Sequence, residues 1–480
     1  MLITDLLISP SCLAEALRDP RSAAGQAVER ARAAGVRVWL ATGALGAYRS
    51  AAPSAAVLAA FAAPCQWLSA LSGDADPAAD DPLAVLLSRG LARLGAGARL
   101  LGRREGDLAP EALLAATLDP QPVAFVDLAA QQDRIRPELE RRLDAVLRHG
   151  HYIMGPEIAE LEARLAAYVG VRHAISCASG TDSLEIAMRA LGIGPGDEVI
   201  TVPFTWISTA ETIAQVGATP VFVDIEPATF NLDPARLAAA ITPRTRAIMP
   251  VSLFGQMPDM AAISAIAGKI PVIEDGAQSF GATRHGRRSC GVSAIGSTSF
   301  FPAKPLGCYG DGGCLFSDDE ALAARMRAIR THGGEKRHHH PYIGMNGRLD
   351  TLQAAVLLAK LALWDDEVAA RGRIGAHYTQ LISQRASAVT PPALLAGNTH
   401  VYAQYTIRAA DRDGLAARLK AQGIPTAVYY PKCLHQQPCF AHVGHGPFPE
   451  SERASREVLS LPMHPLLTPG LQERIVAGLA

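Results

Sequence analysis

The stretch SFFPAKPLGCYGDGG, from Ser299 to Gly313, is the most informative segment of the chain. Its first residues alternate between small and aromatic side chains, as they do in a buried strand. The strand runs into Lys304, Pro305 and a series of glycines, which allow close backbone approach because they carry no Cβ atom. An isolated lysine is usually a solvated surface residue. This segment alone leaves open whether Lys304 is such a surface residue or an amine that serves a bound ligand.

Short β-type runs alternate with helical or loop segments from Phe125 onward. The runs are HAISC, EVITV, TPVFVDI, AIMPVSLFG, IPVIED and STSFF. Because they are mostly apolar, we expect a mainly parallel sheet with helices on both faces and ligands at the carboxyl ends of the strands. One long helical stretch around Asp365 leads to further strand signals, YAQYTIRA and IPTAVYYP, which predict a smaller C-terminal domain.

Three other motifs supply polar groups where the expected strands end. SCASGTDSL opens a helix, so the amides of Gly180 and Thr181 and the Thr181 hydroxyl can cradle a phosphate. PFTWIST offers Trp206 as an aromatic plate, and IPVIEDGAQSF supplies Asp275 and Gln278. Taken singly, these motifs have plain structural explanations, namely helix caps and a core aromatic residue.

Together with Lys304, these groups are the parts needed to hold pyridoxal 5'-phosphate. The lysine would form the Schiff base, and Asp275 would keep the ring nitrogen protonated so that the ring can withdraw electrons. The sequence therefore predicts Lys304 and Asp275 as the catalytic residues of an enzyme that uses this cofactor.

From about Phe125 to the C-terminus the chain resembles the DegT-type nucleotide-sugar aminotransferases, which are fold type I enzymes dependent on pyridoxal phosphate. The resemblance rests on motifs that occur in the same order: YIMGPEIAELE, SGTDSL, PFTWIST, VIEDGAQ, SFFPAKPLGCYGDGG and IGMNGRLDTLQAA. It implies an α/β fold with a large cofactor-binding domain over residues 123–365. A small C-terminal domain would follow over residues 366–480.

The resemblance also implies roles for individual residues. Lys304 is the Schiff-base lysine, Asp275 pairs with the ring nitrogen and Gln278 lies near the ring hydroxyl. Trp206 stacks on the ring. The phosphate is held by Gly180, Thr181 and Ser299. The chain has Pro305 where the family usually has an asparagine, which leaves the local contacts of this loop open.

In the same family, Asn346 of the GMNGR segment reaches the phosphate bound in the neighbouring subunit. This implies a homodimer with shared sites. Arg348 is then a candidate for binding the carboxylate of a sugar substrate across the interface, because its planar guanidinium matches a carboxylate. An ordinary structural ion pair explains Arg348 equally well.

Within the family, the segments PVSLFGQ, PTAVYYPKCLHQQP and SLPMHPLL are most similar to enzymes that aminate C3 of a UDP-2-acetamido-3-keto-hexuronic acid. We therefore expect transfer of an amino group from glutamate to a nucleotide-linked keto sugar, for surface polysaccharide or lipopolysaccharide synthesis. UDP and dTDP both remain open as carriers. One alternative is a sugar dehydratase of the same fold, which has histidine in place of Lys304. Another is a regulatory or nuclease protein that acts through the N-terminal region.

The amino-acid composition of the chain limits the classes of partner that we expect. The 45 basic and 46 acidic residues nearly balance, so we expect neither nucleic acid nor a membrane as a partner. Eight cysteines without CxxC pairs and the lack of a basic-then-apolar leader predict a cytoplasmic protein. Three consecutive histidines in RHHHPY, residues 337–342, cannot all face one ion, so we expect a solvated or substrate-facing loop and no metal site.

Residues 1–118 lie outside the usual extent of the family. They resemble a PIN-like α/β domain, in which carboxylates that follow the strands hold metal ions for RNA cleavage. Asp5, Asp81 and Asp107 stand at matching places, but the acid expected beside Asp5 is replaced by the apolar LLI. Two-metal hydrolysis needs a dense carboxylate cluster, so we expect a degenerate, non-catalytic domain.

Overall fold

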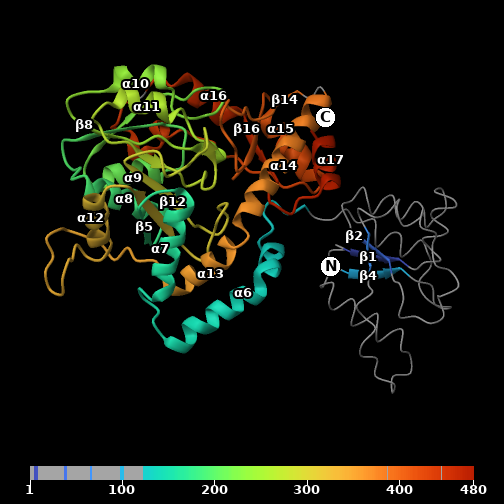
Figure 1. Ribbon diagram of the computed structural model, residues 1–480. Coiled ribbons are helices and arrows are strands. Elements are labelled where there is room, and N and C mark those ends of the chain that lie inside the picture. Colours follow the sequence, from blue (N-terminus) through green and yellow to red (C-terminus); the bar gives the residue numbers. More distant parts are fainter. Residues whose placement is uncertain are drawn as a thin grey trace. The chain divides into compact units, whose positions relative to one another are not determined.

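A computed structural model of the chain describes residues 123–385, 388–444 and 446–479, together with four short strands nearer the N-terminus (Figure 1). Its contacts divide the chain into two compact units. The first comprises Met1–Val123, Ala421–Ile424 and Thr468–Gly478. The second comprises the remaining residues and contains all of the motifs quoted above for cofactor binding.

The N-terminal strands form a parallel sheet in the order β3-β2-β1-β4. The strands are β1 (Asp5–Ile8), β2 (Arg37–Leu40), β3 (Cys65–Trp67) and β4 (Ala98–Leu101). Asp5 is the first residue of β1, at the amino end of the sheet, whereas ligands of parallel sheets lie at the carboxyl ends. Asp81 and Asp107 lie outside the described residues, so the PIN-like resemblance and the non-catalytic assignment stay predictions.

A mixed sheet organises the second unit, in the order β7-β6-β8-β9-β12-β13-β5. A parallel bridge between Ile248 and Val272 joins its two halves. Only β13 runs antiparallel to its neighbours in this sheet. The strands are β5 (His173–Cys177), β6 (Glu198–Thr201), β7 (Thr219–Phe222), β8 (Thr245–Ile248), β9 (Ile273–Asp275), β12 (Ile295–Ser299) and β13 (Gly313–Ser317).

Helices cover both faces of this sheet, which confirms the expectation from its apolar strands (Figure 1). Successive side chains point to opposite faces: Phe316 packs in the cluster with α7 and α13, and Leu315 packs in the cluster with α8 and α12. The helices of this part are α6 (Leu128–His149), α7 (Pro156–Val169), α8 (Gly180–Ala190), α9 (Ser208–Gln215), α10 (Pro234–Ala240), α11 (Met260–Ala267), α12 (Glu320–Arg330) and α13 (Thr351–Leu361).

The C-terminal part contains a small antiparallel sheet in the order β14-β15-β16. Its elements are α14 (Trp364–Gln384), β14 (Val389–Thr390), β15 (Tyr405–Ala409), α15 (Arg412–Ala421), α16 (Pro449–Glu457), β16 (Val458–Leu461) and α17 (Pro469–Ala477). Short elements elsewhere are β10 (Thr283–Arg284), β11 (Arg287–Arg288) and the 3-10 turns η3 (Leu253–Gly255), η4 (Leu434–Gln436) and η5 (Pro438–Phe440).

Two sequence predictions need correction. The long helical stretch around Asp365 is two helices, because α13 ends at Leu361 and α14 begins at Trp364. IPTAVYYP is not a regular strand, since only Ala427 forms an isolated bridge, to Ser460. Pro425 lacks the backbone N–H that a ladder requires. The predicted domain boundary between residues 365 and 366 falls inside α14, and the division at that point stays a prediction.

No helix among the described residues is long and apolar enough to cross a membrane.

Candidate active site

The ends of four neighbouring strands bring the predicted site residues together. Asp275 at the end of β9 is in register with Ser297 of β12, and Ser299 at the end of β12 is in register with Gly313 of β13. Gly313 is in turn in register with Cys177 at the end of β5, which leads into α8. The sheet edge therefore places three of the quoted motifs side by side.

A cavity of about 430 Å³ opens at this edge. Its size suits a cofactor or small ligand. All the predicted cofactor-binding residues except Asn346 line it: Gly180, Thr181, Trp206, Asp275, Gln278, Ser299 and Lys304. Sequence reasoning missed other lining residues, among them Thr205, Gln404, Tyr429 and Tyr430.

The amino terminus of α8 forms one wall of the cavity. Ser179 caps this helix, because its side chain accepts a hydrogen bond from Asp182 N at 3.0 Å. Gly180 lies so close to β12 that a Cβ atom built on it would be 2.7 Å from the Cβ of Ser299. The free N–H groups and dipole of a helix start favour an anion, so the predicted phosphate cradle has suitable geometry.

Asp275 is the buried carboxylate of the cavity, with 5% of its surface exposed. Its Oδ2 accepts a hydrogen bond from Thr209 Oγ1 at 2.9 Å, and its Oδ1 accepts one from Ala277 N at 3.2 Å. Burial raises the pKa of this carboxyl above its usual value, whereas these two donors and the nearby Lys304 oppose the rise. The carboxylate is thus placed to hold a cationic group.

Lys304 is half-buried on the connection between β12 and β13. Burial lowers the pKa of its amine, and the attraction of Asp275 opposes this shift. The connection is pinned, since Lys304 N donates to Phe301 O at 2.8 Å and Cys308 N donates to Phe300 O at 2.8 Å. Gly307 is required for close approach, because a Cβ atom there would lie 2.5 Å from Pro302 O.

Two neighbouring aromatic residues, Trp206 and Tyr430, also line the cavity. The rings of Trp206 and Tyr430 lie 5.9 Å apart between centroids, and the Trp206 side chain is exposed at the cavity. Gln278 is held at both ends of its amide: Oε1 accepts from Phe254 N at 2.7 Å, and Nε2 donates to the Tyr430 hydroxyl at 3.1 Å. The amide orientation is fixed by these bonds.

Asn346 and Arg348 do not line the cavity of their own chain. They contact each other, with Arg348 Nε donating to Asn346 Oδ1 at 3.0 Å, and Asn346 is exposed. A role for either residue at a neighbouring subunit's site stays a prediction.

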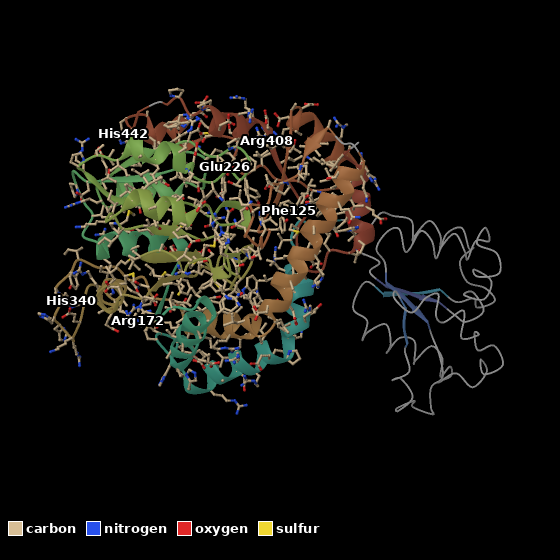
Figure 2. The ribbon with its side chains drawn as sticks, turned by 45° about the horizontal axis from the view of Figure 1, so that its top comes forward. Phe125, Arg172, Glu226, His340, Arg408 and His442 are labelled. Atoms are coloured by element: carbon tan, nitrogen blue, oxygen red, sulfur yellow. The ribbon has the colours of Figure 1, made fainter. Side chains whose placement is uncertain are left out.

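None of the residues of the histidine-rich segment, 337–342, lines the cavity. Figure 2 shows His340 on a segment that projects from the body of this unit, and residues 337–341 are exposed. Among the described residues, no group of three or more histidine, cysteine, aspartate or glutamate side chains could hold a metal ion.

Residues 133–480 match the DegT/DnrJ/EryC1/StrS aminotransferase family. The chain belongs to this family. The UDP-2-acetamido-2-deoxy-3-oxo-D-glucuronate aminotransferase of Pseudomonas aeruginosa is 53% identical over 359 residues, 74% of this chain and 99% of the relative. A UDP-N-acetyl-3-dehydro-alpha-D-glucosamine 3-aminotransferase of Acidithiobacillus ferrooxidans is 43% identical over 351 residues, 72% of this chain and 94% of the relative.

Solved structures of DegT-family aminotransferases share the fold. An aminotransferase of this family from Brucella abortus has a TM-score of 0.72 and 45% identity, covering 74% of this chain and 98% of its own. NtdA from Bacillus subtilis, solved with bound cofactor PMP, has a TM-score of 0.70 and 31% identity, covering 74% of this chain and 84% of its own. These likenesses confirm the predicted fold type I aminotransferase architecture.

The cavity fits the cofactor on which DegT-family aminotransferases depend. A side chain on Gly180 would fill the cradle beside Ser299, and the α8 terminus suits a phosphate. The buried Asp275 suits a protonated ring nitrogen, and Lys304 suits an aldehyde. When bound, pyridoxal phosphate supplies that aldehyde and an electron-withdrawing ring.

Proposed function

We propose that the protein transfers an amino group from glutamate to C3 of a UDP-2-acetamido-3-keto-hexuronic acid, with pyridoxal phosphate as cofactor. The observation that carries this proposal is the convergence of Lys304, Asp275 and the α8 cradle on one cavity. The two relatives named above support the class of substrate, since the names of both describe aminotransferases of a 3-oxo or 3-dehydro sugar linked to UDP.

Six residues of the cavity then have defined tasks. Gly180, Thr181 and Ser299 bind the phosphate, and Trp206 lies against the ring. Asp275 holds the proton at the ring nitrogen. Lys304 Nζ would hold the cofactor through its aldehyde. As a free amine it would take a proton from the carbon of the donor in the first half-reaction and give a proton to the carbon of the keto sugar in the second. Burial favours this second role, because it lowers the pKa of the amine.

Asn346 and Arg348 do not line the cavity of their own chain, but substrate recognition gives them a role. The only lysine or arginine lining the described cavity is Lys304, which leaves no other cation there for the carboxylate of a hexuronic acid. We propose that Arg348 supplies it from the second subunit of a homodimer, and that Asn346 reaches the phosphate from the same side. A cytoplasmic location fits an enzyme that consumes glutamate and nucleotide sugars for surface polysaccharide.

The dehydratase alternative is not favoured, because the position that would carry histidine carries Lys304. The relatives and the family likewise support an aminotransferase over a regulatory or nuclease function.

Purified protein should be assayed with glutamate and a panel of UDP- and dTDP-linked keto sugars. The 3-keto hexuronic acid should be aminated, and its neutral 3-keto glucosamine counterpart should be a poorer substrate. Arg348→Gln should raise KM for the hexuronic acid at least tenfold but leave KM for the neutral sugar within about threefold, since only the former loses a charged hydrogen bond. Equal effects on both sugars would contradict the role of Arg348, and amination only of 4-keto sugars would contradict the assigned carbon.

A further inference from the structure

Few hydrogen-bond donors stabilise the negative charge of the Asp275 carboxylate. Among the described contacts it accepts hydrogen bonds from Thr209 Oγ1 and Ala277 N. The Ala277 bond comes from the backbone two residues away and is the longer of the two, at 3.2 Å against 2.9 Å. Among the described residues, Thr209 is therefore the side chain whose hydrogen bond both orients this carboxylate and stabilises its charge.

The direction of the hydrogen bonds around Thr209 follows from counting hydrogens. Thr209 Oγ1 has one hydrogen and gives it to Asp275. The 3.2 Å contact between Thr205 Oγ1 and Thr209 Oγ1 must then have Thr205 as the donor. Both hydroxyls are buried, with 3% and 1% of the residue exposed, and Thr205 lines the cavity. A bond donated to Thr209 polarises the bond that Thr209 donates onward.

We infer that Thr209, supported by Thr205, is a positioning residue that holds Asp275 in its charged, acceptor form opposite the cofactor ring. This inference rests on the proposed function, because it takes the ring nitrogen of the cofactor as a further hydrogen-bond partner of the Asp275 carboxylate. Without the Thr209 hydroxyl, the shared proton should move from the ring nitrogen toward Asp275. The ring would then lose positive charge and withdraw electrons less strongly.

Other titratable groups near Asp275 also influence its protonation. The titratable groups that interact with it are Lys304, Glu274, Cys290 and Tyr430. Glu274 is satisfied separately, by Ser252 Oγ, Ser289 Oγ and Cys290 N. Substitution of Thr209 therefore removes a hydrogen bond to Asp275 without removing a partner of Glu274.

The test uses the full chain loaded with pyridoxal phosphate and three variants. Thr209→Val removes the hydroxyl with little change of shape, Thr209→Ser restores it, and Thr205→Val removes only the supporting donor. Thr212→Val is the matched control, since Thr212 is buried on the same helix and donates only to Ser208 O, at 2.8 Å. Readouts are the pH dependence of the visible absorbance of the bound cofactor, and kcat and KM for glutamate.

Thr209→Val should move the absorbance midpoint to higher pH, because a ring with less positive charge makes the attached nitrogen more basic. It should lower kcat about tenfold and change KM for glutamate less than about twofold, in keeping with loss of one charged hydrogen bond. Thr205→Val should shift the midpoint in the same direction by less, and Thr209→Ser and Thr212→Val should titrate as the unmodified protein does.

Unchanged midpoints in Thr209→Val and Thr205→Val, with cofactor still attached to Lys304, would overturn the role of Thr209 and leave the proposed function intact. If the unmodified protein does not attach the cofactor to Lys304, the proposed function fails first and this inference falls with it. A midpoint shift in Thr212→Val as large as that in Thr209→Val would also overturn the inference, because the effect would then be a general one of helix α9.

Discussion

Gly180 and Ser299 approach so closely that a Cβ atom on the glycine would lie 2.7 Å from the serine Cβ and 3.1 Å from its Oγ. The contact joins the start of α8 to the end of β12 at the predicted phosphate cradle. Gly180→Ala should therefore weaken binding of pyridoxal phosphate at least tenfold, because the cradle must open to admit the methyl group. Cofactor titration followed by absorbance or fluorescence measures the change in Kd.

Gly372→Ala is the matched control for this substitution. Gly372 lies in α14, and a Cβ atom there meets nothing within 4 Å. The alanine should leave cofactor binding unchanged and stabilise the fold by about 1 kcal/mol through its higher helix propensity. Unimpaired cofactor binding by Gly180→Ala would contradict the position of the phosphate.

Asp275→Asn should bind the cofactor but lose more than tenfold in kcat, about 1.4 kcal/mol of barrier. A neutral amide cannot keep the ring nitrogen protonated, although it nearly preserves the shape of the side chain. Single-turnover reaction with glutamate, followed spectroscopically, gives the rate. Asp311→Asn is the control, because Asp311 also lines the cavity but is exposed. A loss in Asp275→Asn no larger than that in Asp311→Asn would count against the assigned role.

The sequence predicted those cavity residues that lie in a recognisable motif directly after a strand. Asp275, Ser299 and Lys304 could be found because each stands where a β-type run ends, and parallel strands bring such ends together. Tyr430 could not be found in this way, because Gln278, its hydrogen-bond partner, is 152 residues away and the segment around Tyr430 has no regular strand.

Thr209 was missed for a different reason. It lies inside the quoted PFTWIST motif, but a threonine after a helix start is typical of a cap or a plain polar residue, and only the tertiary contact with Asp275 gives it a function. The glycines after Lys304 were correctly linked to close backbone approach, as the contact of Gly307 with Pro302 shows. How far Asn346 and Arg348 complete a site depends on a second chain, which one sequence cannot place.

Lys360 provides a test of stability against pH. Its amine is buried without a hydrogen-bond acceptor among the described residues and lies 4.6 Å from the centroid of the Tyr309 ring. Burial lowers the pKa of this lysine to about 8, although Glu367 and Cys308 oppose the shift. Between pH 8 and the unfolded value of 10.5 the unfolded chain binds more protons, so the free energy of unfolding should rise with pH in that window.

Lys360→Met should accordingly stabilise the protein at pH 7, on the order of 2 kcal/mol, because it removes a buried charge. The gain should shrink between pH 8 and 10.5. Thermal or urea unfolding of both proteins at several pH values measures it, with the exposed Lys269→Met as the control. Destabilisation by Lys360→Met at pH 7 would contradict the view that this buried amine lacks an acceptor.

Sharing of sites between subunits can be tested by mixing two inactive chains. Lys304→Ala and Asn346→Ala each disable a site, but one site of their heterodimer keeps both residues if Asn346 acts across the interface. Activity should therefore return toward a quarter of the unmodified value after subunit exchange, since about half of the dimers are mixed and each has one intact site. Mixing Lys304→Ala with Asp275→Asn should restore nothing, because both residues serve the cavity of one chain. Mixed dimers that form but stay inactive in the first pair would contradict the shared site.

The most direct test of the account is covalent capture of the cofactor at Lys304. The purified protein loaded with pyridoxal phosphate should be yellow, and borohydride should abolish the visible absorbance and fix the cofactor to the chain. Peptide mapping should then find one modified lysine, Lys304, and Lys304→Ala should acquire no label there. A reduced label on another lysine, or a protein that binds no cofactor at all, would contradict the assignment.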